Sequence, residues 1–190
     1  MIPHPIDSFD FKLLEEYDDV AEVYVKGPTG EIGSGRIQAY GASEGELKRL
    51  CREVHDRDCE VNVVVNATCF GGEQFTRRWV RKTLGVLERL HSAGVDALTV
   101  ADPYLIDLIR HYGFPFKIVV SILASVTDPV RARYFDELGV DRISLSPDVN
   151  RSPEVIKSIR RAVSCELGIL LNEGCLLNCP YRRFLSLIHI

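Results

Sequence analysis

The 190-residue sequence lacks any apolar run long enough to cross a membrane as a helix. Its longest apolar segment, residues 118–124, has the length of a strand, far below the ~20 residues that a membrane helix needs. The amino terminus has neither the basic region nor the apolar region of a secretory signal. We therefore expect a cytoplasmic protein without membrane contact. Its six cysteines should stay reduced and serve as core residues or metal ligands.

The sequence also lacks a basic excess. Its formal net charge of −4 gives no electrostatic reason to expect a polyanionic partner. The densest basic stretch consists of Arg77, Arg78, Arg81 and Lys82. This stretch falls on a predicted helix, and we interpret it as the solvated outer face of that helix.

Several catalytic signatures are missing. The sequence has no Walker loop, no Gly-x-Ser-x-Gly elbow and no His-Glu-x-x-His motif. No Gly-x-Gly-x-x-Gly turn follows a predicted strand, which argues against a dinucleotide-binding fold. Residues 30–36 are rich in glycine without that spacing, so we interpret them as a simple turn or an active-face loop. In the second case Arg36 is a candidate for binding substrate.

What the sequence does contain is an alternation of short β-rich runs with longer helical patterns. The runs are rich in Val, Ile and Leu, as expected for parallel strands buried on both faces. They cover residues 21–25, 61–66, 97–101, 117–121, 142–146 and 166–172. The helical patterns cover residues 44–56, 76–93, 103–112, 129–138 and 153–163. A Gly-Val-Asp phrase begins at both Gly94 and Gly139, where a helix would end and a strand begin, which is typical of a βαβ array.

Polar residues end five successive apolar runs. An open doubly wound sheet and a closed (β/α) barrel both fit the alternation, but in a barrel such positions converge on the catalytic mouth. Helix caps and turns are the alternative explanation for some of them. On the barrel interpretation, the candidate pocket residues are Asn66, Asp102, Ser121, Ser146 and Asn172.

The number of strands falls short of a whole barrel, which uses eight strands in ~250 residues. We find about six, so the sequence predicts an α/β fold of the TIM-like (β/α) barrel type that is incomplete, with predominantly parallel strands. We expect residues 1–190 to form a single domain and to be a fragment that lacks the last strands.

The segment after the last predicted strand carries the strongest chemical signal. Cys175 and Cys179 stand four positions apart, so they can lie on one face of a helical turn and share a ligand. Thiolates bind iron–sulfur clusters or zinc, both of which normally need four ligands. Two ligands must then come from Cys69 or from residues outside the sequence; two packed thiols are the alternative. Glu173, beside this pair, is a candidate acid–base residue.

Two further interpretations concern cysteine. A radical S-adenosylmethionine enzyme would have a third cysteine at the position of Arg182, and its motif would follow the first strand rather than the sixth. These two differences argue against a radical S-adenosylmethionine enzyme. Cys51 and Cys165 are interpreted as packed core thiols.

The order of these motifs resembles the collagenase-like peptidase family, peptidase family U32. The resemblance rests on residues 61–67, 94–103, 117–121, 135–146 and 166–175. It implies a TIM-like barrel and a cysteine set that, in several members, holds a four-iron–four-sulfur cluster. The family name records a proteolytic activity; other members are similar to oxygen-independent hydroxylation factors that act on RNA bases or a quinone ring. The usual Gly-x-x-Cys and Ser-Gly-x-Cys pattern is replaced here by Cys175 and Cys179, so the remaining cluster ligands would lie outside the chain.

The leading hypothesis is therefore an iron–sulfur enzyme of this family in its full-length form, with Cys175 and Cys179 as cluster ligands. Arg182 is available for an anionic group of the substrate. A peptidase or other hydrolase is the second hypothesis, and a non-catalytic barrel that binds a partner subunit or a second copy is the third. The substrate is left open between a small molecule, RNA and a peptide.

Overall fold

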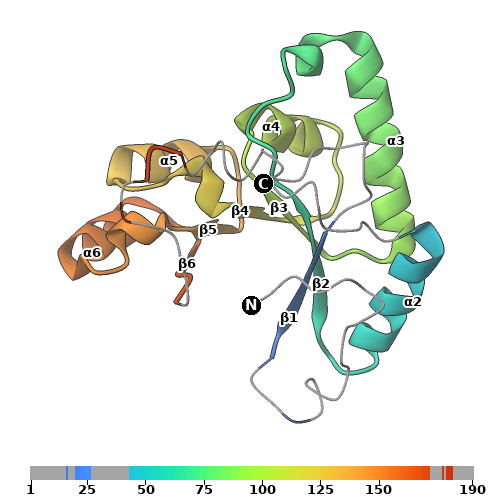
Figure 1. Ribbon diagram of the computed structural model, residues 1–190, viewed down its shortest axis with the longest axis horizontal. Coiled ribbons are helices and arrows are strands. Elements are labelled where there is room, and N and C mark those ends of the chain that lie inside the picture. Colours follow the sequence, from blue (N-terminus) through green and yellow to red (C-terminus); the bar gives the residue numbers. More distant parts are fainter. Residues whose placement is uncertain (1–15, 17–19, 27–42, 172–176, 178, 182–190) are drawn as a thin grey trace.

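The computed structural model describes residues 16, 20–26, 43–171, 177 and 179–181, and within them six parallel strands form one sheet in the order β1-β2-β3-β4-β5-β6 (Figure 1). The strands are β1 (Glu22–Lys26), β2 (Glu60–Val65), β3 (Ala97–Val100), β4 (Lys117–Val120), β5 (Arg142–Ser144) and β6 (Glu166–Gly168). The helices are α2 (Glu44–His55), α3 (Arg77–Ala93), α4 (Pro103–His111), α5 (Pro129–Glu137) and α6 (Pro153–Ala162). Three short 3-10 helices are η2 (Glu73–Phe75), η3 (Ile122–Ala124) and η4 (Pro147–Val149).

The strand order distinguishes the two architectures that the sequence left open. A doubly wound sheet reverses its strand order at a switch point, whereas in a barrel each strand pairs with the next one along the chain. Here the six described strands follow chain order without reversal, and every pairing is parallel. The predicted α/β fold is confirmed, with six parallel strands and five α-helices between them in the described residues. Within the described residues the sheet is open between β1 and β6.

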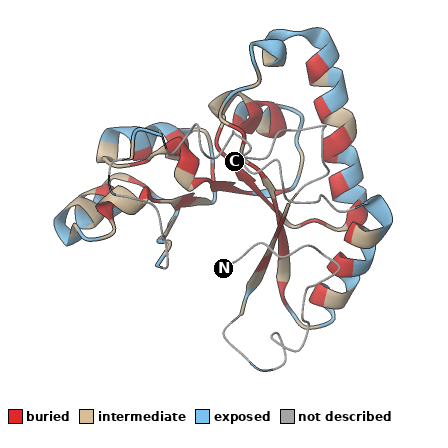
Figure 2. Ribbon diagram, in the orientation of Figure 1, coloured by how far each residue is buried: buried red, intermediate tan, exposed pale blue. Residues whose placement is uncertain are grey.

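One face of the sheet packs against the helices and forms the core (Figure 2). Along this face Val63 lies beside Leu98, and Leu98 beside Ile118. All three are fully buried, together with Leu50 of α2 and Leu87 of α3. Each helix contributes an apolar stripe because its apolar residues recur every three or four positions. The core therefore lies between the sheet and its helices, as in the outer shell of a barrel.

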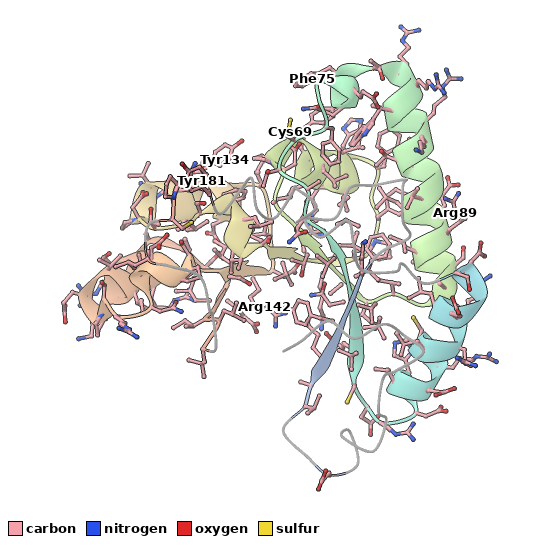
Figure 3. The ribbon with its side chains drawn as sticks, in the orientation of Figure 1. Cys69, Phe75, Arg89, Tyr134, Arg142 and Tyr181 are labelled. Atoms are coloured by element: carbon pink, nitrogen blue, oxygen red, sulfur yellow. The ribbon has the colours of Figure 1, made fainter. Side chains whose placement is uncertain are left out.

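The opposite face of the sheet is concave and carries charge at its amino end. Arg142, the first residue of β5, donates from Nη2 to both carboxylate oxygens of Glu22, the first residue of β1, at 2.7 and 2.6 Å (Figure 3). Lys117 of β4 forms an ion pair with Glu60 of β2. Three strands separate β1 from β5 in the sheet, so the Glu22–Arg142 contact requires the sheet to curl toward itself. This curl is the geometry of a barrel wall.

The repeated Gly-Val-Asp phrase has a structural counterpart. Asp96 precedes β3, and its Oδ2 accepts from the backbone N of Val61 (2.8 Å) and contacts Nε2 of His55 (2.8 Å). Asp141 precedes β5, and its Oδ2 accepts from the backbone N of Ile118 (2.7 Å) and from Nη2 of Arg110 (2.7 Å). Each aspartate thus fixes the start of its strand to the neighbouring strand and to a helix. The glycine two positions earlier permits the left-handed turn, with φ of 92° at position 94 and 74° at position 139.

Five of the six described strands end earlier than the sequence predicts, whereas β1 ends one residue later, at Lys26. The backbone N of Ser146 donates to Val126 O (3.0 Å), and Pro147 begins η4, so β5 ends at Ser144 rather than at residue 146. Because β6 pairs with β5, its ladder ends at Gly168 rather than at residue 172. The three 3-10 helices were not predicted either. Among the described residues, no helix combines the length and the apolar character that crossing a membrane requires.

Candidate functional site

Two of the predicted strand-end residues meet at the carboxyl end of the sheet. Asn66 follows β2 and Ser121 follows β4, and Nδ2 of Asn66 donates to Oγ of Ser121 at 3.0 Å. Since β3 lies between these strands, the bond spans its carboxyl end. Ser121 is 2% exposed, and its Oγ also accepts from the backbone N of Leu123 at 3.3 Å, which caps η3. Both groups are therefore held in fixed positions at this edge.

Asp102, which follows β3, acts as a helix cap. Its Oδ1 accepts from the backbone N of Tyr104 at 2.8 Å, and Pro103 is the first residue of α4. An aspartate before a proline is a favoured helix start, because the carboxylate satisfies a backbone donor that has no partner within the helix. This contact matches the capping alternative for Asp102, which still stands at the rim of the sheet edge.

Ser146 is fully buried at the end of β5, and its Oγ donates to Oδ2 of Asp148 at 2.8 Å. The sequence reasoning missed Asp148, a partly exposed carboxylate that the Ser-Pro-Asp order could have indicated, since the serine and the aspartate bracket a proline turn. It also missed Asn150, whose Nδ2 donates to Leu170 O at 2.8 Å. This bond holds the backbone at Leu170, shortly after β6.

The other predicted site residues fall largely outside the described part of the chain. These are Arg36, Asn172, Glu173, Cys175 and Arg182. Cys179 is described and partly exposed. Cys69 is exposed in the loop between β2 and η2, where its Sγ accepts from the backbone N of Gly71 at 3.4 Å (Figure 3). Within the described residues, no three His, Cys, Asp or Glu side chains are placed to share a metal ion.

The remaining thiols belong to the core. Cys51 is 1% exposed on α2, and Cys165 is 8% exposed just before β6. Burial raises the pKa of each thiol to about 12, and the neighbouring carboxylates of Asp96 and Asp136 act in the same direction. Both cysteines therefore stay protonated at neutral pH, which agrees with the packing role predicted for them.

The difference in burial between Cys69 and the two core thiols predicts the order in which they are alkylated. With iodoacetamide at pH 8, Cys69 is expected to react at least about tenfold faster than Cys51 or Cys165, because only the thiolate reacts and only Cys69 is exposed. Peptide mapping by mass spectrometry over time measures the three rates in one sample. Equal rates in the folded protein would contradict the burial of Cys51 and Cys165, and equal rates in urea provide the control.

The described residues define an α/β protein whose parallel strands curl as part of a barrel, with polar side chains at their carboxyl ends. The family model for Peptidase family U32 matches residues 14–176. The chain belongs to this family, so the resemblance drawn from the order of its motifs is confirmed.

Individual relatives agree with this assignment. The chain is similar to the uncharacterized protease MJ1657 of Methanocaldococcus jannaschii, with 35% identity over 161 residues, 85% of this chain and 48% of the relative. It thus spans about half the length of the curated relative that it matches. Among solved structures, the U32 peptidase Mk0906 superposes with a TM-score of 0.77 at 26% identity, covering 96% of this chain and 70% of that one. The putative copper homeostasis protein CutC from Streptococcus agalactiae has a TM-score of 0.50 at 13% identity, covering 77% of each chain, a likeness of fold alone.

Proposed function

We propose that the full-length protein is an enzyme whose substrate binds at the carboxyl end of this sheet. The observation that carries the proposal is the Asn66–Ser121 hydrogen bond, which joins the ends of β2 and β4 across β3. The amide of Asn66 is partly exposed and is held in this way by the buried Ser121, so it provides a fixed polar group that can orient a substrate. Asp102 and Ser146, which follow β3 and β5, stand at the same edge. In parallel α/β folds this is the edge at which ligands bind.

We propose further that Cys175 and Cys179 hold a four-iron–four-sulfur cluster, and that the reaction is an oxygen-independent hydroxylation. The described residues alone do not fit a complete cluster, which needs four ligands, since their exposed or partly exposed thiols are Cys69 and Cys179. Cys175 and residues contributed from outside this chain would have to supply the rest. Asn150 supports the proposal indirectly, because its hydrogen bond to Leu170 O holds the backbone five residues before Cys175 in the sequence.

Peptide hydrolysis is the second candidate, because two relatives carry protease or peptidase in their names. A serine nucleophile must face the substrate and donate its proton to a base. The Oγ of Ser121 instead accepts hydrogen bonds from Asn66 Nδ2 and Leu123 N, so its lone pairs are already engaged. Ser146 donates to Asp148, but it is fully buried. Neither serine is thus arranged as a nucleophile.

Anaerobic purification of the full-length protein tests the cluster. We expect bound iron and sulfide with absorbance near about 400 nm, a region typical of such clusters. Changing Cys175→Ser and Cys179→Ser together should remove most of the iron. Cys165→Ser is the matched control, because Cys165 is a buried thiol just before β6 and its loss should leave the iron content unchanged.

The other hypotheses give different results in this experiment. A colourless, iron-free protein that cleaves peptides would replace the cluster enzyme with a hydrolase. If the double cysteine change alters neither folding nor activity, the two cysteines have only a packing role.

A further inference from the structure

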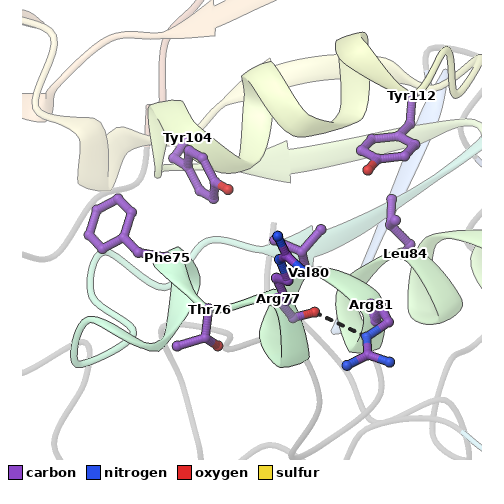
Figure 4. Close-up of a pocket in the computed structure, with 8 residues that line it drawn as sticks. All are labelled: Phe75, Thr76, Arg77, Val80, Arg81, Leu84, Tyr104 and Tyr112. Carbon is purple, nitrogen blue, oxygen red and sulfur yellow. Dashed lines mark hydrogen bonds between the residues drawn. The ribbon is translucent and has the colours of Figure 1, made fainter.

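A groove of about 580 Å³ lies between α3 and α4 (Figure 4). Val80 and Leu84 of α3 are partly buried against the core and form its apolar floor. Tyr104 and Tyr112 face them from α4 and its end. Phe75 of η2 lies against Tyr104, with ring centroids 5.6 Å apart. The groove is open, since Phe75 is 74% exposed and Tyr112 is 52% exposed.

The spacing of the lining residues indicates that an elongated ligand would lie along the helices. Val80 and Leu84 are four residues apart on α3, and so are Arg77 and Arg81, so the helix presents an apolar row beside a basic row. Tyr104 and Tyr112 are eight residues apart, which corresponds to roughly 12 Å along a helix. A second helix laid along the groove would therefore contact it over about two turns.

The basic row lacks acidic partners within the described residues. Arg77 and Arg81 are exposed and form no ion pair there; Nε of Arg81 donates only to the backbone O of Arg77, at 3.4 Å. Two guanidinium groups therefore border an apolar floor in a chain whose formal net charge is −4. Guanidinium groups pair most strongly with carboxylates and phosphates.

The shape of the groove favours one class of anionic ligand over two others. Small-molecule sites enclose most of their ligand, which a groove bordered by such exposed rings does not. Single-stranded nucleic acid needs flat aromatic platforms and a track of several cations. Here the Phe75 and Tyr104 rings are tilted by 53° against each other, and two arginines line the groove. An apolar floor bordered by a row of cations instead matches an amphipathic helix with acidic residues along one flank.

We propose that the groove between α3 and α4 binds an acidic amphipathic helix of a partner protein. Apolar side chains of that helix occupy the floor over Val80 and Leu84, against Tyr104 and Tyr112. Carboxylates four residues apart pair with Arg77 and Arg81. The proposal is independent of the reaction at the carboxyl end of the sheet.

Fluorescence anisotropy with the full chain and a labelled peptide tests the groove. The probe is an Ala-rich peptide of about 15 residues, a length at which an isolated helix becomes marginally stable in water, with Leu at i, i+4 and i+7 and two Glu four residues apart. The comparison peptide carries Lys in place of Glu. We expect saturable binding of the Glu peptide and at least about tenfold weaker binding of the Lys peptide, because complementary charge sets partner choice.

Variants of residues in α3 and η2 test whether the peptide binds in the groove. Changing Arg77→Glu together with Arg81→Glu should weaken binding of the Glu peptide at least about tenfold. Phe75→Ala should also weaken it, because the exposed ring borders the groove. Arg78→Glu is the matched control, an exposed arginine on the same helix that does not line the groove. It should change the affinity by less than about twofold, as an exposed change away from a contact does. Circular dichroism confirms that each variant is folded.

Three results would overturn the proposal. The first is equal binding of the Glu and Lys peptides. The second is the lack of saturable binding by the Glu peptide. The third is a single-stranded oligoribonucleotide that binds more tightly than the Glu peptide and loses its affinity in the Arg77→Glu and Arg81→Glu variant; that result would make the groove a nucleic-acid site.

Discussion

Replacing Arg142 with methionine is expected to lower the free energy of unfolding by about 3 kcal/mol, because it leaves a desolvated carboxylate without its partner. That carboxylate belongs to Glu22, whose side chain is 10% exposed, and Arg142 itself is 27% exposed. Nη2 of Arg142 also donates to the Tyr24 hydroxyl at 3.3 Å. Urea unfolding followed by circular dichroism measures the change.

Two controls separate the loss of an ion pair from the loss of packing. Changing Glu22→Leu together with Arg142→Met should recover most of the stability, since an apolar pair can replace a buried ion pair at little cost. Lys117→Met removes half of the Glu60–Lys117 pair, whose side chains are 39% and 56% exposed. It should cost less than about 1 kcal/mol, as exposed pairs do. An Arg142→Met cost no larger than that of Lys117→Met would show that the Glu22 carboxylate is well solvated.

Replacing Arg110 with alanine is expected to cost about 2 kcal/mol, because one guanidinium donates hydrogen bonds to three groups. Its nitrogens donate to Gly139 O (3.0 Å), Phe116 O (3.1 Å) and the Asp141 carboxylate (2.7 Å). Arg110 thus ties α4 to the starts of β4 and β5. Equilibrium unfolding of the variant measures the loss.

Two further variants make this prediction specific. Arg110→Lys keeps the charge but not the planar fork, so it should recover only part of the loss. His55→Ala removes the corresponding partner of Asp96, a single contact between partly exposed groups, and should cost less than about 1 kcal/mol. If Arg110→Lys were as stable as the native chain, the backbone hydrogen bonds of Arg110 would contribute nothing measurable.

Much of the fold could be predicted from local signals. The helices α4, α5 and α6 each begin with proline at the predicted residue, because proline suits the first position of a helix. Strand ends were harder to predict. Nothing in the composition of residues 142–146 shows that Ser146 gives its backbone N to Val126 O instead of to a strand ladder. That choice depends on tertiary contacts, which override local preference.

The candidate site was predicted in part. Polar residues at strand ends indicated Asn66 and Ser121 separately, but the bond between them depends on the curl of the sheet, which residue spacing does not specify. Arg77, Arg78 and Arg81 are exposed, as predicted. The groove beside two of them was missed because it depends on how far apart α3 and α4 lie. The catalytic, binding and metal-ligating roles of all the candidate site residues remain predictions, including those of Arg36, Asn172, Glu173, Cys175, Cys179 and Arg182.

The contact between Glu22 and Arg142 also bears on the order in which the chain folds. The two residues are 120 positions apart in the sequence. Closing a loop of that length in a disordered chain is entropically unfavourable, and one ion pair cannot compensate for it. Assembly of β2, β3 and β4 shortens that search, because each strand brings the next one alongside. We therefore expect this pair to form late in folding, once a curved sheet already holds its two ends near each other.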